Sequence, residues 1–283
     1  MFKDVRHKDA RHRYRFLDGP NGLYANLESG DMPEYSWIEP SYFDVPEMDK
    51  HASDQHPAHD VSEGDALIKN LYEAIVASPI WNETAFVITY DEHGGFFDHV
   101  KPEENIPNPD GLAYKDEFDF TRQGVRVPFV VVSPWVKKGT VVHGTGAGQG
   151  QYEHSSIPAT VIHKLFKSDV KPPLLQPDYL TERDAWAATF EDVFDTNVDA
   201  DGTPTLRTDC LQTLPEIVRH RTLYANSSTY GADKMTDLQE NLVKMMAGAV
   251  NDLTLMEKFE ALSTWTEAQG GAYVYNKMKE YLE

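Results

Sequence analysis

Two uninterrupted apolar runs stand out in the middle of the chain, and each has the length of a β-strand. Residues 84–90 (TAFVITY) and 127–133 (VPFVVVS) are rich in Val, Ile and Phe. A run without polar alternation predicts a strand that is covered on both faces. A shorter stretch, residues 34–39 (EYSWIE), predicts another strand that ends at Pro40.

Helical spacing of apolar residues separates these strands. Ser62 lies three residues before Asp65 in a capping-box pattern, and apolar positions then recur at helical spacing until Pro79. A second helix is expected over residues 156–166, after a polar entry. Strand, helix and strand in succession predict a βαβ unit, and therefore an α/β fold.

The rest of the chain is more polar. Residues 101–126 are rich in Pro, Gly and acidic side chains and predict a long surface loop, and residues 195–204 predict a turn-rich acidic linker. Residues 233–263 predict an amphipathic helix, which either packs onto the main body or binds a partner or a membrane. Its apolar stripe comprises Met235, Leu238, Leu242, Met245, Met246 and Ala249. We therefore expect a catalytic part over residues 1–190 and a linker with a mainly helical region over 191–283.

The charge balance restricts the partners. The chain has 46 acidic and 26 basic residues, a formal net charge of −20. Nucleic-acid binding requires a clustered basic surface, so we expect no nucleic-acid partner. The same charge predicts weak attraction to anionic bilayers, so peripheral membrane contact would depend on apolar surface or bridging cations. The charged N-terminal residues are unlike a signal peptide, and no apolar run is long enough to span a membrane, so a cytosolic or peripheral location is the default expectation.

Two carboxylates follow directly on the strand predicted at 84–90. Ligands collect beyond the carboxyl ends of strands in open α/β sheets, and Asp91 and Glu92 occupy that place. Adjacent carboxylates repel each other, and a hard divalent cation relieves that repulsion. Taken alone, the pair also fits a turn cap or a partner for an arginine.

Further groups accompany these acids. The paired glycines Gly94-Gly95 allow a sharp turn, after which Asp98-His99 follows. Imidazoles and one more acid come from other segments, namely His56, His59, Glu153 and His154. Each histidine alone fits an ordinary surface or core position, but together these groups predict a metal-dependent phosphoryl-transfer or hydrolytic site. Arg126 precedes strand 127–133, so we expect it at the opposite end of the sheet in a structural salt bridge.

Four ordered motifs resemble a known family. They are DQHPAHDVSEG, SPIWNETAFVITYDEHGGFFDHV, GVRVPFVVVSPWVKKGTVVHG and YEHSSIPATV. These motifs, over about residues 30–190, closely resemble plant-type non-specific phospholipases C, which are members of the phosphoesterase family that also contains bacterial phospholipases C and certain acid phosphatases.

The resemblance implies a fold, an activity and a set of site residues. It implies an alkaline-phosphatase-like α/β fold, with a central sheet, flanking helices and a helical C-terminal extension. It also implies hydrolysis of glycerophospholipids to diacylglycerol and a phosphorylated head group, with a divalent metal ion, expected to be Ca²⁺, and a hydroxyl nucleophile. The implied metal ligands are Asp91 and Glu92, the implied catalytic histidines near the phosphate are His56 and His154, and the implied supporting residues are Asp98, His99 and Glu153.

The chain also departs from the family pattern. The family's ENRSFDH-like and T-x-PNR-like N-terminal segments, which supply further metal ligands and the nucleophile, do not occur, and DGPNG at 18–22 does not replace them. We therefore assign no nucleophile and expect residue 1 to fall inside the domain, so that catalysis needs upstream residues. The alternatives are a truncated, inactive paralogue that binds lipid or protein, and a phosphomonoesterase.

Overall fold

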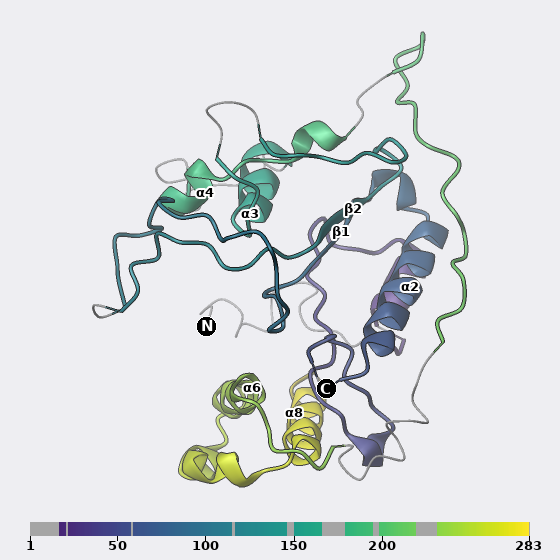
Figure 1. Ribbon diagram of the computed structural model, residues 1–283. Coiled ribbons are helices and arrows are strands. Elements are labelled where there is room, and N and C mark those ends of the chain that lie inside the picture. Colours follow the sequence, from purple (N-terminus) through teal and green to yellow (C-terminus); the bar gives the residue numbers. More distant parts are fainter. Residues whose placement is uncertain are drawn as a thin grey trace. The chain divides into compact units, whose positions relative to one another are not determined.

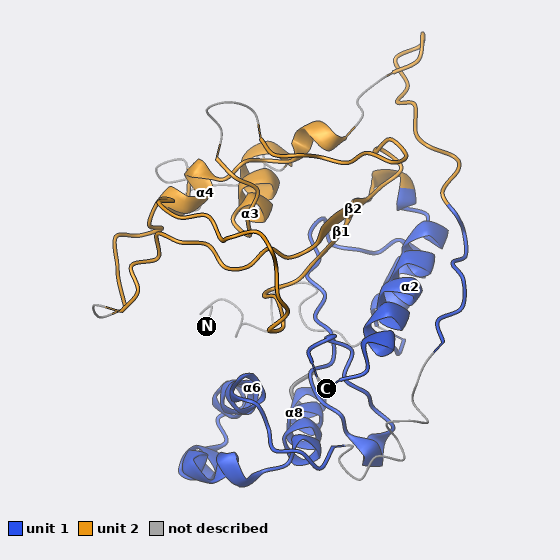
Figure 2. Cartoon of the chain, viewed as in Figure 1, with its two compact units in different colours: residues 1–81, 211–283 blue, residues 82–210 orange. Residues whose placement is uncertain are grey.

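The computed structural model describes residues 17–20, 22–57, 59–114, 117–145, 150–165, 179–194, 198–218 and 231–282 as a mixed α/β structure (Figure 1). Its main elements are α1 (Leu23–Ser29), α2 (Val61–Ala77), β1 (Phe86–Thr89), β2 (Phe129–Val132), α3 (Ser156–Thr160), α4 (Glu182–Trp186), α6 (Asp237–Ala249), α7 (Leu253–Met256) and α8 (Glu267–Leu282). The chain divides into two compact units, residues 1–81 with 211–283, and residues 82–210 (Figure 2). These units reflect packing, and the predicted division at residue 190 stays a prediction.

The sheet lies in the unit formed by residues 82–210. β1 and β2 pair antiparallel, with Phe86 opposite Val132 and Thr89 opposite Phe129. Residues 34–39 form no strand, so the predicted βαβ unit is wrong for the described residues. The prediction of strands covered on both faces is also wrong here, because β1 is half-buried and Phe129 and Val130 are exposed. Within the described residues this sheet has two strands, which leaves its apolar side chains few neighbours.

The helix predicted after residue 60 is confirmed as α2. Its N-cap is Asp60 rather than Ser62, because the Asp60 carboxylate accepts a hydrogen bond from the Ser62 amide at 3.0 Å. Leu71 and Ile75 are buried on one side of the helix, as the spacing predicts. The helix ends at Ala77, next to the predicted stop.

The amphipathic helix predicted over residues 233–263 is three shorter elements: α6, α7 and a 3₁₀ helix, Phe259–Thr264. A capping box formed by Thr236 and Gln239 begins α6. The buried face of α6 is centred on Val243 and Ala247, whereas Leu238 and Met245 of the predicted stripe are exposed. α8 packs against α6, and this packing decides which face is covered.

The remaining predicted segments are irregular or short. The loop at 101–126, of which 115–116 lie outside the described residues, folds back on itself through Ile106 N to Thr121 O (3.0 Å) and Gln123 N to Glu103 O (2.9 Å). The helix predicted over 156–166 is α3 followed by a π-helical turn, Val161–Leu165, and residue 166 lies outside the described residues. Residues 195–197 of the predicted linker lie outside them as well. In the described ranges, none of the helices combines the length and apolarity that crossing a bilayer requires.

Candidate functional site

The loop that follows β1 is a turn held by hydrogen bonds from its backbone amides to its own carboxylates. Gly94 and Gly95 have φ values of +63° and +79°, a region that glycine adopts without strain, so the sharp turn predicted there is confirmed. The Glu92 amide donates to Asp91 Oδ1 (2.9 Å), and the Gly94 amide donates to Glu92 Oε2 (2.7 Å). The loop therefore presents Asp91 and Glu92 at its start, and both are exposed.

These two carboxylates carry no cationic side-chain partner among the described residues. None of the ion pairs in that part of the chain includes Asp91 or Glu92. Each has one oxygen engaged by a backbone amide of the loop and one without a hydrogen bond from a described residue. Two neighbouring uncompensated carboxylates fit a hard divalent cation, which prefers oxygen ligands.

His154 lies beside the end of β1. Its Nε2 is 2.8 Å from the carbonyl oxygen of Tyr90, the residue before Asp91. A carbonyl oxygen only accepts, so Nε2 carries the hydrogen, and Nδ1 is the ring nitrogen left to exchange a proton. We call residues 91–100 the acidic loop. The structure thus brings His154 next to the start of this loop, although 64 residues separate it from Tyr90.

Glu153 precedes this histidine and has an unsatisfied buried oxygen. Its backbone amide donates to Ser156 Oγ at 3.0 Å, at the start of α3. Its Oε1 is buried without a hydrogen-bond partner in the described residues. A buried carboxylate oxygen without a donor is costly, so this position suits a cation or a proton donor that the described residues do not supply.

The other end of the acidic loop is bound to Arg126, three residues before the start of β2. Arg126 donates to Asp98 through Nε (2.6 Å) and Nη2 (2.9 Å), and this guanidinium, with the amide of Val100, holds the pKa of Asp98 well below its usual range. His99 is exposed, with Nδ1 3.5 Å from the same carboxylate. The expected salt bridge of Arg126 is confirmed, but its expected place at the opposite end of the sheet is wrong. Antiparallel pairing puts the start of β2 beside the end of β1.

His56 belongs to the other unit. It is exposed, its Nδ1 lies 3.0 Å from Pro57 O, and its carbonyl oxygen accepts from the His59 amide at 3.0 Å. The two units are described separately, so the approach of His56 to a phosphate near Asp91 stays a prediction. The roles assigned from sequence to Asp98, His99 and Glu153 also stay predictions.

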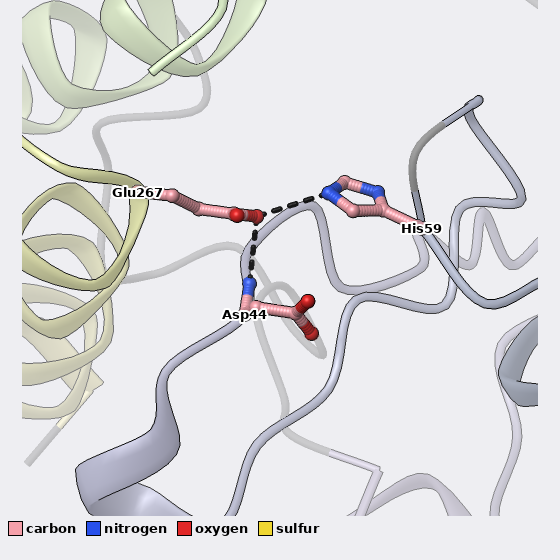
Figure 3. Close-up of side chains that lie close together, drawn as sticks. All are labelled: Asp44, His59 and Glu267. Carbon is pink, nitrogen blue, oxygen red and sulfur yellow. Dashed lines mark hydrogen bonds and ion pairs between the residues drawn. The ribbon is translucent and has the colours of Figure 1, made fainter. Parts of the chain in front are cut away.

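A partly buried cluster of His59 with three acids, Asp44, Asp54 and Glu267, forms a second group of candidate residues. His59 Nδ1 lies 2.7 Å from Asp54 Oδ1, and its Nε2 lies 3.0 Å from Glu267 Oε1. Glu267 Oε1 also accepts from the Asp44 amide (2.8 Å), as Figure 3 shows, and from Gln239 Nε2 (3.0 Å). We call these four residues the His59 cluster.

The charges of the His59 cluster favour a protonated imidazole. Burial opposes the charge, but hydrogen bonds and attraction from Asp54 and Glu267 outweigh it and raise the pKa of His59 to about 10. Burial, with a contribution from Glu267, raises the pKa of Asp44. Ligand atoms of Asp44, His59 and Glu267 lie within 4.8 Å of one another, so these three could hold a metal ion. A metal would have to displace the proton on His59, and both ring nitrogens are already satisfied.

Sequence reasoning identified His59 as a candidate but missed Asp44 and Glu267. The hydrogen bond from Asp44 to Glu267 spans 223 residues, a separation that no local pattern encodes. The available local signal was the capping pair Thr266 and Gln269, which marks the start of α8. This pair predicts the start of a helix but does not predict that Glu267 contacts Asp44 and His59.

Comparison with known proteins identifies a family and several similar proteins. The model of the phosphoesterase family matches residues 2–167. Three curated proteins of Arabidopsis thaliana are similar: non-specific phospholipase C4 (41% identical over 91% of this chain), C5 (43% over 84%) and C6 (44% over 90%). The aligned regions cover 45%, 42% and 45% of those proteins, so the chain spans about half the length of the curated relatives it matches.

Proposed function

The chain belongs to the phosphoesterase family, and from that premise we propose that it serves in phospholipase C-type hydrolysis of glycerophospholipids. The reaction would cleave a phosphodiester bond and release diacylglycerol and a phosphorylated head group. The observation that carries this proposal is the identity of 41–44% to three proteins named non-specific phospholipase C, sustained over 84–91% of the chain.

The proposal includes the finer architecture. We assign residues 1–190 to the C-terminal part of an alkaline-phosphatase-like catalytic domain, in which β1 and β2 would belong to a larger central sheet. Residues 191–283 would be the acidic linker and the mainly helical C-terminal region. The family match over residues 2–167 supports the first assignment.

Asp91 and Glu92 are the residues that would hold the metal ion, for which we propose Ca²⁺. Their uncompensated carboxylates support this role. A divalent ion bound there supplies polarisation of the phosphoryl group and stabilisation of an alkoxide. The backbone hydrogen bonds of the loop fix one oxygen of each carboxylate, which limits how far either side chain can turn away.

His154 is the proposed proton donor to the leaving oxygen. Its bond to Tyr90 O orients the ring and leaves Nδ1 available for that proton. His56 is proposed as the second histidine near the phosphate. Asp98 is proposed to support the site by fixing the end of the acidic loop through its ion pair with Arg126. His99 and Glu153 are proposed as further supporting residues of the same site.

Because the proposed catalysis needs upstream residues, the test uses the chain joined to a family N-terminal segment that carries the remaining metal ligands and the nucleophile. Phosphatidylcholine in mixed micelles with added Ca²⁺ is the substrate, and the assay measures release of phosphocholine. Asp91→Asn and Glu92→Gln should each reduce the rate by about a hundredfold or more, because removing a ligand weakens metal binding and charge stabilisation together. Glu34→Gln, an exposed acid outside the proposed site, is the matched control and should leave the rate unchanged.

Two results would count against the proposal. Unchanged rates in Asp91→Asn and Glu92→Gln would remove the metal site from it. No release from the unsubstituted protein with the upstream segment present, together with retained vesicle binding, would favour the alternative of a non-catalytic lipid-binding protein. Calorimetric titration with Ca²⁺ separates a lost metal site from a lost proton donor, because His154→Ala should retain calcium binding.

A further inference from the structure

Two adjacent aromatic side chains are exposed beyond the acidic loop. Phe96 and Phe97 are 64% and 92% exposed, and Phe97 is the most exposed large apolar side chain in the described part of the chain. A single exposed apolar residue is ordinary, but two neighbouring phenyl rings expose a larger apolar surface to water, which is unfavourable. We call these two residues the Phe tip.

The backbone beneath the Phe tip is held in place from both sides. Before it, the Phe96 amide donates to His93 O (3.0 Å), and the Phe96 carbonyl oxygen accepts from His93 Nδ1 (2.8 Å). After it, the Asp98 carboxylate binds Arg126 and accepts from the Val100 amide (3.0 Å). The rings therefore project from an ordered loop, and inserting them elsewhere requires little further ordering of the backbone.

We propose that the Phe tip inserts into the interfacial layer of a zwitterionic phosphatidylcholine bilayer and so brings the acidic loop to its substrate. This inference rests on the proposed function, because a phospholipase must reach a phosphodiester at the membrane surface. The Phe tip begins four residues after Glu92, so its insertion would place the carboxylates at the level of the head groups. Aromatic rings are favoured at that level of a bilayer.

Charge selects the zwitterionic surface over an anionic one. The chain has a formal net charge of −20, and of the three acids in residues 91–100 only Asp98 is paired with a cationic side chain of the described residues, Arg126. An anionic bilayer would repel this acidic chain, whereas a choline head group offers a quaternary ammonium that the faces of phenyl rings attract. The apolar rings supply the affinity, and the head-group charge supplies the selectivity.

The experiment is co-sedimentation of the full chain with phosphatidylcholine vesicles up to millimolar lipid. Phe97→Ser should weaken partitioning about tenfold, and Phe96→Ser with Phe97→Ser together about a hundredfold, because each removes a phenyl ring from the interface. Leu253→Ser is the matched control, since Leu253 is 60% exposed in the other compact unit and should leave partitioning unchanged. Replacing part of the phosphatidylcholine with phosphatidylglycerol should weaken binding of the unsubstituted chain.

Several outcomes overturn the inference. They are failure of the unsubstituted chain to bind phosphatidylcholine vesicles, equal binding by the double variant, or a self-associated form in light scattering that the double variant abolishes. Hydrolysis of dispersed short-chain phosphatidylcholine distinguishes this failure from failure of the proposed function. This hydrolysis is measured with the upstream segment present. If dispersed substrate is hydrolysed but the Phe variants bind vesicles normally, only the inference fails. If vesicle binding depends on the Phe tip but no dispersed substrate is hydrolysed, only the proposed function fails.

Discussion

The His59 cluster predicts a pH-dependent stability that one substitution can isolate. Replacing Glu267 by Gln keeps the shape and an acceptor oxygen but removes the negative charge that lies 3.0 Å from His59 Nε2. The side chains of His59, Asp54 and Glu267 are only 11%, 9% and 7% exposed, so solvent screens this charge incompletely. Removing one partner of a poorly solvated pair is more costly than removing one on the surface.

The magnitude follows from the pKa of His59. At about 1.4 kcal/mol per pH unit, the rise from 6.5 to about 10 corresponds to at most about 5 kcal/mol of unfolding free energy. Asp54 supplies a comparable share, and the partly exposed ring reduces the total. We therefore expect Glu267→Gln to lower the unfolding free energy by about 2–3 kcal/mol at pH 6.

The raised pKa of His59 determines the direction in which stability changes with pH. The folded pKa of His59 lies above the unfolded value, so the stabilisation is fully present below about pH 6.5 and is lost as the pH rises through about 10. The difference between the unsubstituted chain and Glu267→Gln should therefore shrink to less than about 1 kcal/mol near pH 10.

Urea unfolding followed by tryptophan fluorescence measures both quantities, because Trp265 packs against the apolar core of the same unit. Glu280→Gln is the matched control: it lies on the same helix, its ion pair with Lys277 is exposed, and it should change stability little at either pH. Equal destabilisation by Glu267→Gln at pH 6 and pH 10 would refute the electrostatic reasoning and leave a packing effect.

Two further predictions concern packing and the acidic loop. Val243→Ala should lower the unfolding free energy by about 2 kcal/mol, because Val243 is fully buried, whereas Leu238→Ala on the exposed side of the same helix should change it little in the same urea assay. Arg126→Met should speed cleavage by chymotrypsin after Phe96 or Phe97 severalfold, since it removes the ion pair that holds Asp98; an unchanged cleavage rate would show that the ion pair does not order the loop.

Local patterns predicted those elements whose signals lie close together in sequence. The apolar spacing before Pro79 located α2 to within two residues, and the paired glycines located the turn after β1. Both depend on backbone and side-chain preferences within a few residues. The exact cap was missed, because Asp60 and Ser62 are both good caps and the local backbone geometry decides between them.

Long-range pairing was predicted less well. The sequence located both strand segments but not their antiparallel pairing, and so it misplaced Arg126 relative to Asp98. A strand's apolar run has no direction, and its orientation follows from the path of the intervening chain. The same limitation applies to α6, whose buried face depends on where α8 packs.

The sequence alone determined the family and the chemical character of the candidate site: two carboxylates after a strand, histidines in ordered motifs, and a strongly acidic chain. Tertiary structure alone decided that His154 reaches Tyr90 O, that Arg126 neutralises Asp98 rather than Asp91, and that Glu267 meets His59. The physical reason is range. Motifs and propensities act between near neighbours, whereas a salt bridge or a buried ion pair forms between whichever groups the folded backbone brings within about 3 Å of each other.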